Sequence, residues 1–64
     1  MWIQTSSIGY ALLYEEKREL IEMEARYANG TVIVYIKDGK PLLKFERHGN
    51  IRLYWYEGDN RYER

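Results

Sequence analysis

The sequence predicts an all-β fold: a five- or six-stranded antiparallel meander, curved into a small half-open barrel. Two dipeptides, Asn29-Gly30 and Asp38-Gly39, each lie between runs in which apolar and polar residues alternate. Such dipeptides favour type I′ turns, whose twist matches that of the strands they join. A third turn is expected at His48-Gly49-Asn50. The second half of the chain is therefore predicted to form consecutive hairpins.

The N-terminal segment 1–7 is a candidate extra strand, or an arm that covers the sheet. Its apolar residues Trp2 and Ile3 are separated from the meander by Thr5-Ser6-Ser7. At the other end, residues 58–64 form a predicted polar C-terminal tail, in which Tyr62 is the one aromatic residue.

The segment 10–28 is compatible with two structures. It is rich in strong helix formers, and Asn29-Gly30 could cap a helix. Residues 21–27, however, alternate apolar and charged side chains, which is the period of a strand. We therefore expect two strands joined by a four-residue loop at 15–18. This loop places Leu12 opposite Ile21, Tyr10 opposite Met23 and Ile8 opposite Ala25. The alternative is an α+β domain, with a helix 10–28 packed on a three-stranded antiparallel sheet.

The predicted loops fix the register of each hairpin, because a slip of one residue would turn a whole strand over. All three loops place apolar residues opposite apolar residues on a common face. The expected apolar pairs are Tyr27 with Val32, Ala25 with Val34, Met23 with Ile36, Val34 with Leu43, Val32 with Phe45, Ile36 with Pro41, Phe45 with Leu53 and Leu43 with Trp55. Glu46 is expected opposite Arg52 as an ion pair.

Both faces of the predicted sheet are apolar. An antiparallel sheet with one solvated face should alternate apolar and polar residues, and a large exposed apolar patch usually marks an interface. The predicted buried face holds Ile8, Tyr10, Leu12, Ile21, Met23, Ala25, Tyr27, Val32, Val34, Ile36, Leu43, Phe45, Leu53 and Trp55. On the second face, the candidate interface consists of Ile33, Tyr35, Leu42, Tyr54 and Tyr56.

Length and composition limit the class of protein. A chain of 64 residues is expected to form one domain, 1–64, with a core of marginal size. It contains no cysteine, which favours a reducing compartment, and we expect a cytoplasmic protein. No apolar run approaches the length that crosses a bilayer, so no membrane partner is expected. The formal net charge is zero, which gives no long-range attraction to nucleic acid.

These features predict a non-catalytic binding module that self-associates through the tyrosine-rich face. A dimer is the simplest assembly, and another protein is the other partner considered. Tyrosine suits such a surface because it combines a large rigid ring with a polar tip. One alternative is single-stranded nucleic acid, contacted by Lys37, Lys44, Arg52, Tyr35 and Tyr54. Another is a small ligand, held at a subunit interface or in a barrel mouth lined by Tyr10, Tyr27 and Trp55.

The sequence indicates no enzyme. His48 is the one histidine, and no cysteine is present to complete a metal site with it. Glu15 and Glu16 are adjacent, so their side chains diverge instead of forming an acid/base pair. We therefore expect no catalytic residue, no metal ligand and no cofactor.

Overall fold

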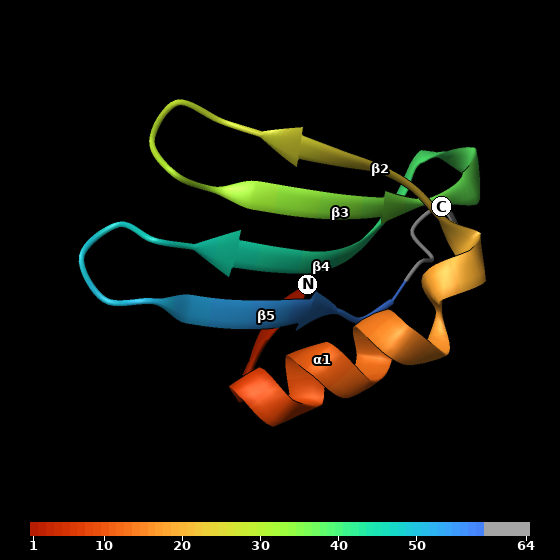
Figure 1. Cartoon of the computed structure of the whole chain (residues 1–64), viewed down its shortest axis with the longest axis horizontal. Coiled ribbons are helices and arrows are strands. Elements are labelled where there is room, and N and C mark those ends of the chain that lie inside the picture. Colours follow the sequence, from red (N-terminus) through yellow and green to blue (C-terminus); the bar gives the residue numbers. More distant parts are fainter. Residues whose placement is uncertain (59–64) are drawn as a thin grey trace.

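The computed structural model describes residues 1–58, and these form a five-stranded antiparallel sheet with a helix packed on it (Figure 1). The strand order is β1-β5-β4-β3-β2, so the meander prediction holds for β2 to β5. The fold is predominantly antiparallel β, but the sheet is not closed into a barrel. The predicted polar tail lies outside the described residues from residue 59 onward. The elements are β1 (Trp2–Thr5), α1 (Ser7–Glu16), the 3-10 turn η1 (Arg18–Leu20), β2 (Ile21–Arg26), β3 (Val32–Ile36), the 3-10 turn η2 (Lys37–Gly39), β4 (Lys40–Glu46) and β5 (Arg52–Tyr56).

The segment 10–28 is neither two strands nor one helix. Residues 7–16 are helical, and the strand begins only at Ile21. Ser6 is the N-cap of α1, since its Oγ accepts a hydrogen bond of 3.0 Å from the backbone N–H of Gly9. This cap, followed by good helix formers such as Ala11, Leu12 and Leu13, explains why the strand predicted before the 15–18 loop is wrong.

The β2–β3 hairpin differs from the prediction by one residue. Tyr27 pairs with Thr31, whose carbonyl accepts a hydrogen bond of 2.8 Å from the Tyr27 N–H. The loop therefore has three residues, and within it the positive φ is confined to Gly30, at 97°. A loop of this length with a glycine bulge competes with the two-residue type I′ turn. The slip turns Met23 and Ala25 away from Val32 and Val34, so the predicted register of this hairpin is wrong.

The other two hairpins agree more closely with the prediction. Asp38 and Gly39 both have a φ of 73°, as the predicted type I′ turn requires. Val32 pairs with Phe45 and Val34 with Leu43, but an irregularity after Val34 pairs Ile36 with Lys40 instead of Pro41. All three predicted pairs between β4 and β5 are confirmed.

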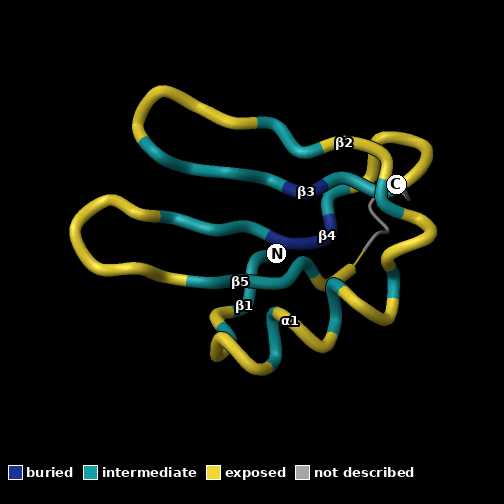
Figure 2. The backbone as a smooth tube through the Cα atoms, viewed as in Figure 1, coloured by how far each residue is buried: buried dark blue, intermediate teal, exposed yellow. Residues whose placement is uncertain are grey.

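The core lies at the centre of the sheet, where β3 meets β4 (Figure 2). Val34 and Leu43 are 1% and 0% exposed, and Leu42 is 8% exposed. Tyr10, Leu13 and Tyr14 of α1 pack against this cluster, together with Ile21, Ile36 and Trp55. Four residues of the predicted buried face are exposed instead: Ile8 (71%), Leu12 (66%), Met23 (53%) and Tyr27 (50%). The first two lie on α1, and the other two follow from the slip in register.

Candidate interaction surface

The two faces of the sheet differ in what covers them. One face carries a row that crosses all five strands at Glu24, Val34, Leu43, Trp55 and Ile3. Since Tyr10, Leu13 and Tyr14 of α1 pack against the cluster that contains Val34 and Leu43, this row lies on the helix side. Side chains alternate along a strand, so the intervening residues lie on the opposite face. No helix or strand of residues 1–58 covers that opposite face.

We call the uncovered side the open face. It contains four of the five residues of the predicted interface, Ile33, Tyr35, Tyr54 and Tyr56, and it extends to both edges of the sheet. The fifth, Leu42, is 8% exposed and belongs to the core, so the prediction that it lies on an accessible surface is wrong. The residues of the open face are Trp2, Gln4, Met23, Ala25, Ile33, Tyr35, Lys44, Tyr54 and Tyr56. Most of them are half-buried.

An aromatic cluster forms the β1 end of the open face. The rings of Trp2 and Tyr56 meet edge to face, with centroids 5.0 Å apart. The Nζ of Lys44 lies 4.8 Å from the centre of the Trp2 ring and 4.9 Å from that of Tyr54. Their contacts are favourable aromatic and cation–π geometries, so this part of the surface is held in a defined shape.

The residues considered for nucleic acid lie in two places, the open face and the η2 turn. Tyr35 and Tyr54 are on the open face, and alternation along β5 puts Arg52 on the same side as Tyr54. Lys37 lies in the η2 turn. Lys44 is already engaged, because its Nζ contacts two rings and lies 3.4 Å from Oε2 of Glu46. Its charge is therefore largely compensated within the chain.

Two tyrosines interact across the β2 end of the open face. The pKa of Tyr35 is raised, first by hydrogen bonding to the Tyr27 side chain and then by burial. The raised pKa means that the Tyr35 hydroxyl is neutral at physiological pH. This end of the face is therefore apolar apart from two phenol groups.

A groove of about 460 Å³ is lined by Tyr10 of α1 and by residues of β2, β3 and β4 and their loops. Tyr10 and Tyr27, both proposed for a barrel mouth, line it, whereas Trp55 does not, because Trp55 packs against the core cluster. Its other lining residues are Glu24, Arg26, Gly30, Val32, Phe45 and Arg47. The groove is bordered by an ion pair, since Nη2 of Arg26 lies 3.2 Å from Oε1 of Glu24.

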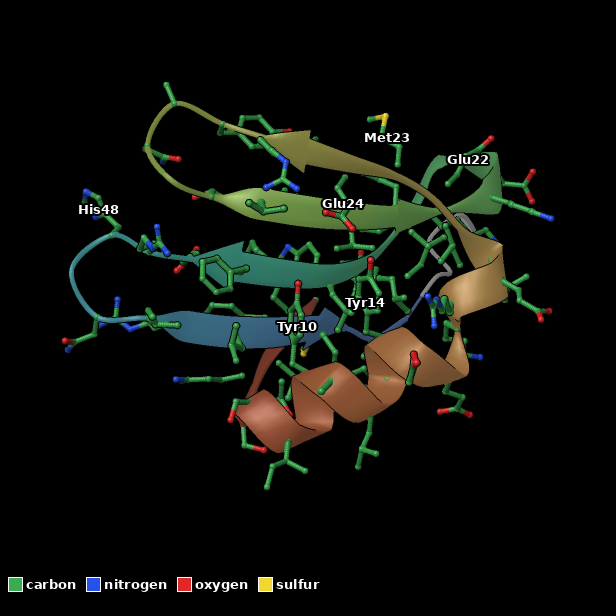
Figure 3. All side chains as sticks on the ribbon, in the orientation of Figure 1. Tyr10, Tyr14, Glu22, Met23, Glu24 and His48 are labelled. Atoms are coloured by element: carbon green, nitrogen blue, oxygen red, sulfur yellow. The ribbon has the colours of Figure 1, made fainter. Side chains whose placement is uncertain are left out.

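Tyr10 and Tyr14 extend from α1 across the sheet toward Glu24 (Figure 3). The Tyr14 hydroxyl donates a hydrogen bond of 2.7 Å to Oε2 of Glu24, which raises the pKa of Tyr14. Burial raises the pKa of Tyr10, and the nearby Glu24 carboxylate adds to that effect. Glu24 thus contacts both the helix and its own strand neighbour Arg26.

The histidine lies far from these groups. His48 is at the tip of the β4–β5 loop (Figure 3). Among residues 1–58, no three His, Cys, Asp or Glu side chains are gathered closely enough to hold a metal ion. In the same part of the chain, no helix has the length and apolar character needed to cross a membrane.

Sequence reasoning missed two parts of the open face. Trp2 belongs to it because β1 pairs with β5, a contact between the two ends of the described chain that no local pattern indicates. Met23 and Ala25 belong to it because of the slip at Asn29-Gly30. The alternation of Lys44 with Phe45 and Leu43 could have placed Lys44 on this face, opposite Tyr54.

Comparison of the chain with protein-family models, with curated proteins and with solved structures finds no match.

Proposed function

We propose that this chain is a non-catalytic interaction module that binds protein through the open face of its sheet, most simply a second copy of itself. The observation that carries the proposal is the aromatic and aliphatic surface of Trp2, Ile33, Tyr35, Tyr54 and Tyr56, which no element of residues 1–58 covers. The absence of cysteine favours the cytoplasm as its location.

The chemistry of the open face favours protein over nucleic acid. Tyrosine rings bury large apolar area while their hydroxyls remain compatible with water in the free state. Completely burying a large apolar side chain contributes about 1.5–3 kcal/mol, and less where the side chain is already half-buried. Single-stranded nucleic acid needs free cations beside its stacking rings, but the Lys44 ammonium already contacts Glu46.

Trp2 supplies a direct reporter of this surface. The chain contains two tryptophans, and Trp55 lies on the helix side. In a Trp55→Phe variant, the tryptophan fluorescence therefore comes from Trp2 alone. Dilution should shift the Trp2 emission to longer wavelength, because dissociation of the partner exposes the Trp2 ring to solvent. Sedimentation of the same samples should show the larger species disappearing over the same concentration range.

A charge placed at the centre of the surface tests the proposal. Tyr54→Glu should weaken self-association by about tenfold or more, because it removes an aromatic ring from the interface and requires a carboxylate, even one beside Lys44, to lose its water there. Leu12→Glu is the matched control, because Leu12 is exposed on α1, on the other side of the sheet. A chain that is monomeric at millimolar concentration would exclude self-association. If Leu12→Glu dissociates the assembly and Tyr54→Glu does not, the interface lies on α1 and the proposal fails.

A further inference from the structure

The edge of β2 has unpaired backbone groups. Among residues 1–58, β2 is the last strand of the sheet, and Figure 1 shows no other strand on its outer side. The Tyr27 N–H points inward to Thr31, so the backbone groups of Ala25 and Met23 also point toward β3. The N–H and C=O groups of Glu24 and Arg26 consequently point outward. An edge of this kind is a template for another strand.

The features that usually protect an edge are scarce along 23–27. These residues include no proline and no lysine, and the irregularity in the pairing lies before them, between Ile21 and Met23. Two large apolar side chains, Met23 and Tyr27, are about half exposed on the open-face side of this edge. On the helix side, the edge carries one acidic and one basic residue, Glu24 and Arg26.

These charges select both a partner and a register. Suppose that a second copy pairs antiparallel about a two-fold axis. Residues whose backbone N–H and C=O groups point outward must then lie opposite residues of the same kind in the partner. An axis through Glu24 would place Glu24 against its own copy, and an axis through Arg26 would do the same with Arg26. An axis through Met23 would set Glu22 against Glu24. Like charges directly opposite one another destabilise a pair of strands.

An axis through Ala25 avoids every like-charge pair. It sets Glu24 opposite the partner's Arg26, and it does so twice because the arrangement is symmetric. It also sets Met23 opposite the partner's Tyr27 twice, so that two half-exposed side chains bury each other. Sulfur–aromatic contacts of this kind are favourable. Backbone direction, charge and apolar surface thus agree on a single register.

We propose that a second copy of this chain adds to the β2 edge by antiparallel strand pairing about a two-fold axis at Ala25, joining two five-stranded sheets into one continuous sheet. The interface is the strand edge, not the open face, so this inference goes beyond the function proposed above. It also extends that function, because Met23, Ala25 and Tyr27 lie on the open-face side and would link the open faces of the two copies.

The chain has no cysteine, so single cysteines can determine the register. Residues that face each other in a non-hydrogen-bonded antiparallel pair have Cα atoms about 4.5 Å apart, within the about 4.4–6.8 Å that a disulfide spans. Ala25→Cys should therefore form a cross-linked dimer under mild oxidation. Met23→Cys and Tyr27→Cys are the matched controls on the same strand and face. Each would lie opposite a different residue and should cross-link at least about tenfold more slowly.

The outcome separates this proposal from the previous one. Ala25→Cys should cross-link equally well when combined with Tyr54→Glu, because the edge pairing does not use Tyr54. Faster cross-linking at residue 23 or 27, or none at any of the three, would overturn the proposed pairing even if the chain still self-associates. Arg26→Glu provides an independent test. It should weaken the dimer about tenfold by placing carboxylates opposite one another, and an unchanged dimer would contradict the register.

Discussion

The hydroxyl of Tyr14 donates a 2.7 Å hydrogen bond to Oε2 of Glu24, and so connects the helix to the outermost strand of the sheet. Glu24 lies on the face where apolar residues are expected, because the slip in the β2–β3 hairpin turned the charged residues of β2 inward. The Tyr14 hydroxyl and Arg26 both contact this carboxylate. A half-buried charge at this position is tolerated because it is hydrogen-bonded.

Removing this hydrogen bond should destabilise the domain. Tyr14→Phe keeps the ring on the core but leaves Glu24 without its donor from α1. We expect a loss of about 0.5–1.5 kcal/mol in the free energy of unfolding, measured by urea denaturation. Tyr10→Phe is the control, since no protein partner of the Tyr10 hydroxyl is found among residues 1–58. Equal losses in the two variants would contradict a specific role for the Tyr14 bond.

The same contacts predict a loss of stability at alkaline pH. The pKa values of Tyr10, Tyr14 and Tyr35 are all raised above their ordinary value of 10.0. As pH rises through that value, the unfolded chain therefore loses protons that the folded chain retains, so the free energy of unfolding falls. The contribution is fully present below the unfolded pKa and disappears as pH passes the folded values.

Thermal melts from about pH 8.5 to about pH 11.5 measure this effect. The melting temperature should be nearly level at first and then fall. Tyr14→Phe removes one of the three groups, so its melting temperature should fall less steeply over the alkaline range. A parent chain and a Tyr14→Phe variant with identical slopes would show that Tyr14 does not contribute.

The sequence predicted the hairpins better than their registers. The β4–β5 pairing was predicted correctly because the loop and the alternation of both strands agree, with Leu43 and Trp55 on the same face. At Asn29-Gly30, two turn types compete for the same dipeptide. The structure adopts the three-residue loop, in which the Thr31 N–H donates a hydrogen bond to Oδ1 of Asn29. One residue of loop length decided the face of a whole strand.

The hydrophobic pattern of the sequence did not predict α1. α1 is apolar on both sides: Tyr10, Leu13 and Tyr14 face the core, whereas Ile8 and Leu12 face outward. Such a helix has no apolar stripe set apart from a polar one, so a search for helical periodicity misses it. Ser6 was the available signal, because a serine before a run of helix formers is a typical N-cap. The alternation along β3 and β5 predicts that Ile33, Tyr35, Tyr54 and Tyr56 share one face, as they do, but it does not reveal that Leu42 is buried in the core. The position of Trp2 depends on a long-range pairing that the alternation does not contain.

A close approach between β1 and α1 gives a third prediction. Gly9 lies in the first turn of the helix, and a Cβ added there would clash with Oγ1 of Thr5. In an exposed helix, Gly→Ala usually stabilises by about 1 kcal/mol. Here Gly9→Ala should instead destabilise by about 1–3 kcal/mol in urea denaturation, because the added methyl group overpacks the contact.

The clash can be relieved from the other side. Thr5→Ala removes the hydroxyl that the new methyl group would meet, so the double variant Thr5→Ala/Gly9→Ala should recover most of the loss. The recovery, measured as the coupling energy of a double-mutant cycle, distinguishes a steric contact from a general effect on the helix. If Gly9→Ala alone stabilised the domain, the close approach would be refuted.

The last prediction compares two leucines, which have the same side chain but differ in how deeply they are buried. Leu43 is completely buried, whereas Leu12 is 66% exposed on α1. Leu43→Ala should cost about 2–5 kcal/mol, which is a large part of the stability of so small a domain. Because that variant can unfold outright, Leu43→Val supplies a milder change of about 1 kcal/mol. Leu12→Ala should change the free energy of unfolding little in dilute samples. If it costs as much as Leu43→Val, then Leu12 is buried in solution, and the exposed side of α1 must be an interface.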